Sequence, residues 1–492
     1  MDAQLPEVLP APAEPHGSED VDVVVVGFGI GGGCAALEAA RAGARVVLLE
    51  RAATYGGTSA MSGGHFYLGG GTPVQQATGH DDSPEEMYRY LMAVSRDPEP
   101  DKVRVFCDDS VEHFGWLESL GFSFERSYFA GKAVIQPGTE GLMYSGNEKV
   151  WPFREQAVPA PRGHKVPVPG DTGGTQMVMD LLARRVEEAG VEARYETGVT
   201  NLVGDAAGVT GVAWRRFGDR GVIRARSVVL AAGGFVMNPE MVAEHTPALG
   251  SKLISLGNTY DDGLALRLGR SVGAELRFMD QPFITAPFYP PASLVTGIIV
   301  NRYGDRFVAE DSYHARTSGF VMDQPGRAAF LVADSAHVEH PSMPLCPFID
   351  GWETVAEMEA GLGIPSGRLA ATLAAYNENA ARRQDPDFHK HADWLEPQDR
   401  GPWGAYDLSL GKALYAGFTL GGLRTSVDSQ VLRHDGSAVP GLYAAGACAA
   451  NIAQDGKGYA SGTQLAEGSY FGRRAGRHAA SATPLVTRGY CL

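Results

Sequence analysis

Three glycines near the start of the sequence have the spacing of a phosphate-binding turn. Gly27, Gly29 and Gly32 form the pattern GxGxxG directly after an apolar run over residues 21–26. Glycine allows a tight turn and lets a pyrophosphate approach the N-terminus of the following helix, where backbone N–H groups and the helix dipole attract anions. Glu50, at the end of the next apolar run, can accept hydrogen bonds from an adenosine ribose. This spacing predicts a dinucleotide-binding site.

Further segments favour FAD over NAD as the dinucleotide. Arg51 precedes a run of Gly, Ser and Thr over residues 56–64, which can cradle phosphates and flank a flavin ring. The apolar run that starts at 228 ends in small residues, Ala232 and Gly233 among them. Residues 441–446 read as a strand that ends in glycine, and a helix opens near Gly462. The sequence has no second GxGxxG, so a nicotinamide-binding domain of the glutathione-reductase type is not expected.

The elements that must position these residues follow from hydrophobic periodicity. Residues 21–26, 45–49 and 227–232 read as buried parallel strands, and residues 31–42 and 177–189 as helices. Between about 282 and 412 prolines and aromatic residues increase, and helices such as 369–382 follow. We predict an α/β fold with a Rossmann-like, glutathione-reductase-type FAD-binding domain over 20–281 and 413–492. An α+β cap or catalytic domain over 282–412 is inserted in it, and residues 1–19 form a disordered lead.

Composition limits the class of protein. The chain has 492 residues with 44% hydrophobic and 20% charged residues, the balance of a soluble enzyme. The net charge of −16 argues against a nucleic-acid partner, which would require a basic face. Five cysteines without a CxxC pair fit reduced thiols, and Cys34 reads as a small buried residue. With no signal-peptide pattern and no long apolar run, we expect a cytoplasmic protein without a membrane span. No metal site is predicted.

The chain resembles, over nearly its whole length, the flavoproteins of the fumarate reductase and succinate dehydrogenase family. The resemblance implies that Asp262 lies in the cofactor site and that Gly446 approaches the ribityl chain, beside Ala447 where many relatives carry Glu. Relatives that bind flavin covalently carry His at the position of Gly57, so non-covalent FAD is implied. The resemblance also places residues at the pyrophosphate, the adenine edge and the pyrimidine end of the flavin: Gly57, Thr58, Ser59, Ser62, Gly63, Gly64, Val199, Gly462, Thr463 and Leu465.

Two substitutions separate this chain from the fumarate reductases. Residues 301–310 match a family block after which fumarate reductases carry a proton-donating Arg, but His314 stands there. Phe418 replaces the His that holds a carboxylate in fumarate reductases. The segment 456–463 is similar instead to the 3-ketosteroid Δ4-(5α)-dehydrogenases, as is Tyr313 in its Glu-Asp-x-Tyr context. The likeness implies desaturation of a 5α-3-ketosteroid to the 4-ene-3-ketosteroid, with Tyr459, Tyr313 and Ser461 as catalytic residues.

The chemistry of desaturation agrees with these residue types. Removing hydrogen beside a ketone requires a base for the α-proton and a hydride acceptor, which flavin N5 provides. Tyrosine is a weak base at its reference pKa of about 10, but a second phenol and a hydroxyl can stabilise the tyrosinate. Backbone N–H groups near Gly462 can polarise the ketone. The apolar stretch 283–299 suits a sterol pocket or, equally, a buried strand and loop. His314 reads as a partly exposed bystander and Glu310 as structural.

Other functions stay open at this point. Within the family, a Δ1-3-ketosteroid dehydrogenase or a fumarate reductase-like flavoprotein are the alternatives. A flavoprotein subunit that delivers electrons to a membrane partner belongs to a different class. The missing covalent-His position and the lack of clustered iron–sulfur cysteines count against such a subunit. The expected partners are a steroid and an electron acceptor that the sequence does not identify.

Overall fold

The first domain contains a large, mostly parallel sheet. The computed structural model describes residues 5–10, 18–171, 173–250 and 252–481. Its strands follow the order β19-β20-β9-β1-β2-β6, and all but β19 run parallel to their neighbours. They span Gln430–Leu432 (β19), Ala438–Ala444 (β20), Asp219–Leu230 (β9), Ser18–Val26 (β1), Val46–Leu49 (β2) and Glu192–Arg194 (β6). The predicted α/β class with a Rossmann-like FAD-binding domain is confirmed.

Both faces of this sheet are covered, which explains the uninterrupted apolar run in β1. Val23 and Val25 pack with the helices Ile30–Arg41 (α1), Gly174–Glu188 (α7) and Thr463–Ser481 (α13). Val24 and Val26 pack on the other face, against Gly198–Asp205 (β7) and Gly208–Arg216 (β8). Because β8 pairs with the first half of β9, that strand begins earlier than predicted. The helices predicted over 31–42 and 177–189 are confirmed.

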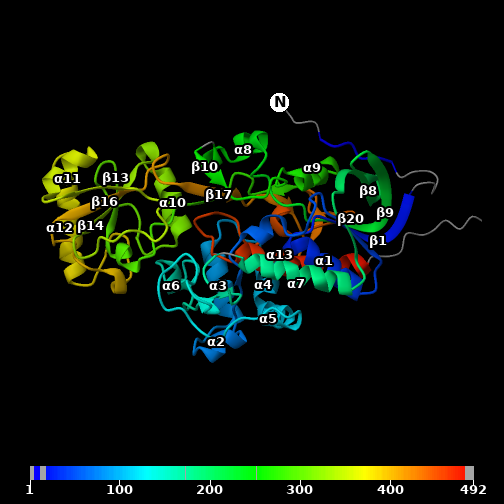
Figure 1. Cartoon of the computed structure of the whole chain (residues 1–492), viewed down its shortest axis with the longest axis horizontal. Helices are drawn as coiled ribbons and strands as arrows, with labels where there is room; N and C mark the ends of the chain where they lie inside the picture. The colour runs from blue at the N-terminus through cyan, green and yellow to red at the C-terminus, as the bar shows by residue number, and fades with distance from the viewer. Residues whose placement is uncertain (1–4, 11–17, 172, 251, 482–492) are drawn as a thin grey trace, which may run out of the picture.

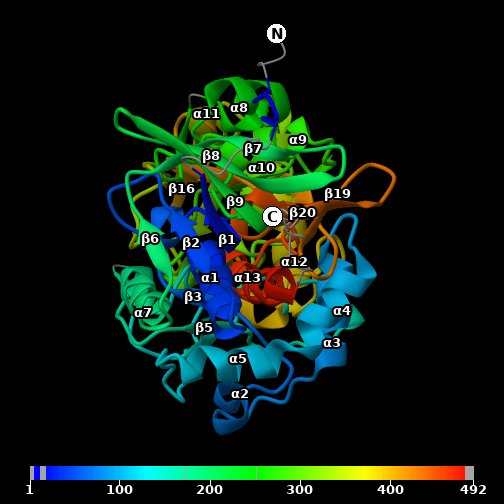
Figure 2. The same cartoon turned by 90° about the vertical axis from the view of Figure 1, so that its right-hand side faces the viewer.

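Helices α1 and α13, from opposite ends of the chain, lie side by side (Figures 1 and 2). Two glycines of α13 allow this approach. A Cβ atom on Gly472 would collide with the carbonyl oxygen of Gly31, and one on Gly476 with that of Ala35. The close packing brings the glycine-rich turn before α1 next to the glycine-rich turn before α13. One ligand site can therefore form from both turns.

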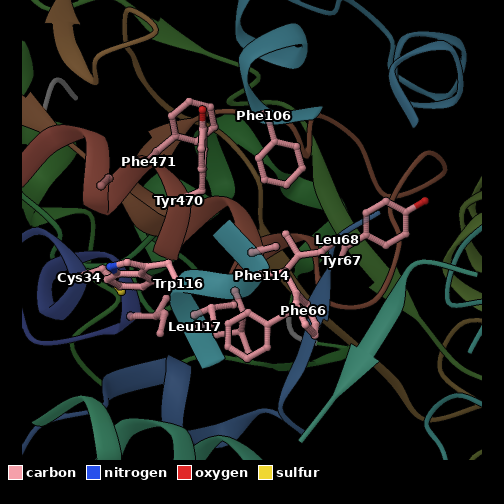
Figure 3. Packing of buried hydrophobic residues seen from close by; sticks show 14 of the residues in the cluster. Cys34, Phe66, Tyr67, Leu68, Phe106, Phe114, Trp116, Leu117, Tyr470 and Phe471 are labelled. Carbon is pink, nitrogen blue, oxygen red and sulfur yellow. The ribbon is translucent and has the colours of Figure 1, made fainter. Parts of the chain in front are cut away.

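A helical region packs beneath these two helices (Figure 2). It contains Pro73–Ala77 (α2), Pro84–Val94 (α3), Pro100–Asp108 (α4), Ser110–Ser119 (α5), Phe153–Gln156 (α6) and a sheet of His65–Tyr67 (β3), Gly163–Lys165 (β5) and Leu142–Met143 (β4). Figure 3 shows Phe106, Phe114 and Trp116 of this region in one buried cluster with Tyr470 and Phe471 of α13. The cluster also contains Cys34, which is fully buried as predicted. This packing anchors α13 along its length.

The second region is the cap, at the left of Figure 1. Four antiparallel strands lie in the order β13-β14-β16-β15, over Ile298–Asn301, Ala329–Asp334, Trp403–Asp407 and Phe348–Trp352. Helices Val355–Leu362 (α11) and Arg368–Ala381 (α12) bury their apolar side chains against this sheet. The helix predicted over 369–382 corresponds to α12. None of the helices in the described ranges is long and apolar enough to cross a membrane.

A small sheet lies between the two regions. It pairs Leu253–Ser255 (β10), Tyr415–Thr419 (β17) and Pro282–Thr285 (β12), and His314–Asp323 (α10) packs beside β12. The remaining elements of this part are Pro239–His245 (α8), Leu264–Ser271 (α9), Leu276–Arg277 (β11), Gly422–Arg424 (β18) and Ala449–Ala450 (β21). Residues of the cap and of the first domain meet at this sheet.

The prediction of a disordered lead over residues 1–19 is wrong for the residues that the structure describes. Leu9 donates its N–H to Leu202 (2.9 Å) and accepts from the N–H of Gly204 (2.9 Å), so it adds to the edge of β7. Ser18 and Glu19 begin β1, because β9 is long enough to pair with them. Composition alone did not reveal these backbone partners. Residues 1–4 and 11–17 lie outside the described residues.

Candidate active site

One continuous cavity of about 420 Å³ starts at the carboxyl ends of β1 and β9 and reaches residues of the cap. Segments from both ends of the sequence meet in its wall. The wall contains the three predicted catalytic residues, Tyr313, Tyr459 and Ser461. It also contains most of the predicted cofactor residues: Gly27, Gly29, Glu50, Arg51, Gly57, Thr58, Ser59, Ser62, Gly63, Val199, Ala232, Gly233, Gly446, Gly462 and Leu465.

Besides Asp262, the predicted cofactor residues Gly32, Gly64 and Thr463 do not line this cavity. Gly32 lies in the first turn of α1 against the carbonyl group of Gly27, where a Cβ atom would not fit. Gly64 has a φ of +85°, a backbone conformation that favours glycine. Thr463 donates its hydroxyl to the Ala460 carbonyl at the start of α13 (2.8 Å). All three shape the backbone behind the wall.

Of the two adjacent aspartates in this turn, Asp261 lines the cavity and the predicted Asp262 does not. Asp262 instead forms an ion pair with Arg51 (2.7 Å). Asp261 accepts a hydrogen bond from the Thr58 hydroxyl, and burial raises the pKa of Asp261 to about 6. The Thr58 oxygen in turn accepts the N–H of Asn258 (2.7 Å). The turn decides which of two adjacent aspartates points inward, and the sequence contains no signal for that choice.

The N-terminus of α1 fits the diphosphate of a dinucleotide. Gly29 is the residue before the helix, and it has no side chain with which to cap this end. The Ile30 N–H donates to Ser59 Oγ (3.0 Å), so Ser59 lies directly at the opening of the helix. A side chain on Gly57 would project into open space in the cavity wall. Exposed N–H groups, a helix dipole and glycine surfaces are the features that receive phosphates.

The adenosine end is built around Glu50, which is 8% exposed. Its carboxylate accepts hydrogen bonds from the N–H groups of Phe28 and Ala52, both at 2.7 Å. Burial raises the pKa of Glu50. A carboxylate has about four lone-pair sites, so two remain for the hydroxyls of a ribose. Val199 and Thr197 line the adjacent wall.

The predicted catalytic residues come together, though in two parts. Tyr313 and Ser461 share a hydrogen bond between their hydroxyl groups (2.7 Å). The hydroxyl of Tyr459 accepts the N–H of Gln464 in the first turn of α13 (3.4 Å). Among the described residues, no hydrogen bond joins Tyr459 to Tyr313 or Ser461. Burial raises the pKa of Tyr459 well above its ordinary value, and the nearby Tyr313 raises it further.

A buried segment over residues 145–147 holds both parts in place. The backbone N–H of Ser461 donates to the Ser145 carbonyl (2.9 Å), and Ser145 Oγ donates back to the Ser461 carbonyl (3.0 Å). Asn147 accepts the N–H of Tyr313 at its Oδ1 (3.0 Å) and donates from Nδ2 to the carbonyl of Lys457 (3.2 Å). Sequence reasoning missed this segment, because its residues have no chemical role of their own that a motif would reveal.

His314 is buried, at 3% exposed, so the prediction of a partly exposed side chain is wrong. It opens α10, which packs beside β12 of the joining sheet, and its ring lines the cavity. Burial lowers the pKa of His314 to about 3, so the imidazole is neutral at pH 7. Glu310 forms buried ion pairs with Arg306 (2.8 Å) and Lys390 (3.3 Å) and lies outside the cavity wall.

The cavity wall beside the tyrosines is apolar. Phe283 and Phe418 stack with ring centroids 4.5 Å apart, and Phe283 meets the ring of Tyr459 at 4.8 Å. Met343 completes this part of the wall. Farther along the stretch predicted as a sterol pocket, Leu294 and Ile299 belong to the core. The start of the stretch 283–299 therefore lines the cavity, and its later residues are buried core, so each of the two predicted roles holds for part of it.

Comparisons with known proteins agree with this geometry. Residues 22–462 match the FAD binding domain family. The urocanate reductase of Eggerthella lenta is 30% identical, and the alignment covers 96% of this chain and 76% of that protein. The 3-oxo-5-alpha-steroid 4-dehydrogenase of Comamonas testosteroni is 27% identical over 87% of this chain and 92% of its own.

A solved structure of a steroid dehydrogenase is similar to nearly all of this chain. It is the 3-ketosteroid Δ4-(5α)-dehydrogenase of Rhodococcus jostii RHA1, in complex with 4-androstene-3,17-dione. The two chains are 39% identical, with a TM-score of 0.90, and the match covers 97% of this chain and 100% of that one. An open flavocytochrome c3 fumarate reductase matches less closely, with 26% identity and a TM-score of 0.65 over 94% of this chain and 78% of that one.

Proposed function

We propose that this chain, which belongs to the FAD binding domain family, is a 3-ketosteroid dehydrogenase that converts a 5α-3-ketosteroid to the 4-ene-3-ketosteroid. The chain is an FAD-dependent oxidoreductase, and the substrate and position of desaturation are the proposal. One observation carries it. The hydrogen-bonded pair of Tyr313 and Ser461 lies with Tyr459 on an apolar wall of the same cavity that receives the cofactor. The likeness to the Rhodococcus steroid dehydrogenase supports the same assignment.

The residues that line the cavity suit the successive parts of FAD. The start of α1, with Gly29 and Ser59, would hold the diphosphate, and Glu50 the adenosine ribose. Gly446 and Leu465 would lie along the remainder. When bound, FAD supplies an acceptor for the hydride that leaves carbon 5 of the steroid.

The protein's own residues would move the proton from carbon 4. Tyr459 Oη would take this proton, and the Gln464 N–H that donates to it favours the charged form of the phenol. The Tyr313–Ser461 pair would pass the proton on. N–H groups in the first turn of α13 would polarise the ketone. The surrounding Phe283 and Phe418 would keep water from the reacting carbons.

Anaerobic bleaching of the flavin tests the proposal directly. A saturated 5α-3-ketosteroid should bleach the purified enzyme, and the product should be the 4-ene-3-ketosteroid. A Δ1-dehydrogenase would instead be bleached by the 4-ene compound and yield a 1,4-diene. Bleaching by the 4-ene compound alone would contradict the Δ4 assignment. Bleaching by no steroid would contradict the steroid assignment altogether.

The cavity is poorly suited to a dicarboxylate, and we expect negligible fumarate reduction. Among the described residues that line it, Arg51 is the only lysine or arginine, and Arg51 is already paired with Asp262. Burial lowers the pKa of His65 to about 4 and that of His314 to about 3, so both rings are neutral. Fumarate turnover with reduced methyl viologen should stay close to the rate without protein. A rate comparable to the best steroid reaction would reverse the assignment.

We also expect that FAD is bound without a covalent bond. By the family resemblance, Gly57 stands at the position of the histidine that attaches flavin covalently, and a glycine offers no side chain for attachment. Precipitation with trichloroacetic acid should therefore release all of the flavin into the supernatant. After washing, the precipitated protein should be colourless and should show no flavin fluorescence in a gel after electrophoresis. Flavin that remains with the polypeptide after denaturation would contradict this prediction.

A further inference from the structure

The loop that carries Tyr459 is attached to α13 by a buried carboxylate. Between β21 and α13, residues 451–462 form neither helix nor strand. Glu467 lies in the second turn of α13 and is 1% exposed. Its Oε2 atom accepts the N–H groups of Ile452 (2.8 Å) and Ala453 (3.0 Å). The carboxylate therefore holds the start of the loop against the helix.

Ala453, one of the two anchored residues, packs with both tyrosines of the site. It belongs to a small buried cluster that also contains Phe283, Tyr313 and Tyr459. Gly456, farther along the loop, lies so close to β12 that a Cβ atom on it would collide with a backbone carbonyl oxygen of that strand. The tightly packed loop has little room to absorb a displacement at its start. We therefore expect a shift of Ala453 to displace Tyr459.

The position of Tyr459 relative to α13 is critical for the reaction proposed above. Tyr459 would take the proton from carbon 4, while N–H groups in the first turn of α13 would polarise the ketone. Both must reach the same steroid at once, so the loop and the helix must keep a fixed register. The hydroxyl of Tyr459 meets this turn through a long hydrogen bond from the Gln464 N–H (3.4 Å). The two shorter bonds to Glu467 make a stronger connection.

We propose that Glu467 is a positioning residue for Tyr459, which holds this base in register with the first turn of α13. The inference rests on the proposed function. Burial raises the pKa of Glu467 to about 7, and the ammonium group of Lys102 opposes the rise. An uncharged carboxyl group is therefore present in part of the molecules at neutral pH, and its carbonyl oxygen still accepts N–H groups. The length of the side chain should matter more than its charge.

Variants that separate length from charge test the proposal. Glu467→Gln keeps the length and an acceptor oxygen, so a saturated 5α-3-ketosteroid should reduce its flavin at close to the wild-type rate. Glu467→Asp keeps the charge but is one methylene group shorter, and we expect flavin reduction about 3- to 10-fold slower. Glu467→Ala removes the acceptor and should slow reduction about 10- to 100-fold. Anaerobic stopped-flow absorbance at saturating steroid gives the limiting rate.

A matched control separates positioning from a general loss of stability. Glu359 in α11 of the cap is 3% exposed, and its carboxylate also accepts two backbone N–H groups, those of Gly367 (2.6 Å) and Ala370 (2.9 Å). It does not line the cavity. Glu359→Ala should lower the Tm as Glu467→Ala does but leave the limiting rate unchanged. Flavin content and the Kd of the 4-ene product should stay close to wild type in all variants.

The rates decide the outcome. A limiting rate in Glu467→Ala close to that of wild type overturns the inference, as does equal slowing in Glu359→Ala. A glutamine variant as slow as the alanine variant also overturns it, because its length and acceptor are intact. If Glu467→Ala does not fold, an aspartate variant as fast as the glutamine variant overturns the inference, and a slower one supports it. A wild-type enzyme whose flavin no steroid reduces contradicts the proposed function instead.

Discussion

Gly29→Glu should abolish FAD binding and leave the chain folded. Gly29 has φ −84° and ψ −171°, an extended backbone that any residue can adopt, so the substitution does not strain the turn. The new carboxylate would lie at the N-terminus of α1, where the diphosphate is expected. Two like charges 4 Å apart repel by about 4 kcal/mol at an effective dielectric of 20. The affinity for FAD should therefore fall by roughly 1000-fold.

Two neutral substitutions at the same position provide the controls. A Cβ atom on Gly29 would stand 3.2 Å from Ser59 Oγ, a tight but tolerable contact, so Gly29→Ala should retain most of the flavin. Gly29→Gln has the shape of glutamate without its charge and should bind FAD more weakly than alanine. The ratio of absorbance at 450 and 280 nm measures flavin content, and circular dichroism confirms the fold. A glutamate variant that purifies with full flavin would refute the assignment of this turn.

The sequence predicted the elements that carry the cofactor because their signals are local. The strand, turn and helix over residues 21–42 combine an apolar run, spaced glycines and helical periodicity within a single stretch. The strand at 441–446 and the helix after Gly462 have equally local signals, and the structure contains both. Close packing of α1 and α13 then follows from glycines on the facing sides of the two helices.

The residues that sequence reasoning missed depend on contacts between distant segments. Asn147 reaches Tyr313, which lies 166 positions away, and no pattern around Asn147 announces that contact. His314 stands in a polar stretch and looks exposed in the sequence, but packing beside β12 buries it. Asp261 and Asp262 differ only in the direction that a turn gives each side chain. Local patterns therefore located the site, and tertiary packing selected its members.

Tyr459→Phe should slow flavin reduction by a saturated 5α-3-ketosteroid by about 10²- to 10⁴-fold, the usual effect of losing a general base. The ring contacts with Phe283 and Phe418 would remain, and the one hydrogen bond lost is the long contact to Gln464 (3.4 Å). FAD content and steroid binding should therefore stay close to wild type. Anaerobic stopped-flow absorbance at 450 nm measures the rate.

The supporting residues should have smaller effects of the same sign. Tyr313→Phe breaks the hydrogen bond to Ser461 and should also slow reduction, because the proposed onward transfer of the proton depends on this pair of hydroxyls. Ser461→Ala should slow it less, since water can partly replace a hydroxyl. Tyr443→Phe is the matched control. Tyr443 is a buried tyrosine whose hydroxyl meets His478 (2.8 Å) away from the cavity, so its loss should leave the rate unchanged.

The pH dependence of the rate distinguishes a base from a packing residue. Because burial raises the pKa of Tyr459 well above its ordinary value, only a small fraction of the phenol is ionised at neutral pH. As long as the pH stays below the pKa, the ionised fraction increases tenfold for each unit by which the pH rises. The wild-type reduction rate should therefore rise steadily with pH. In Tyr459→Phe the profile should be flat. A phenylalanine variant that reduces within a few-fold of wild type, with the same rising profile, would show that Tyr459 packs against the steroid and that the proton goes elsewhere.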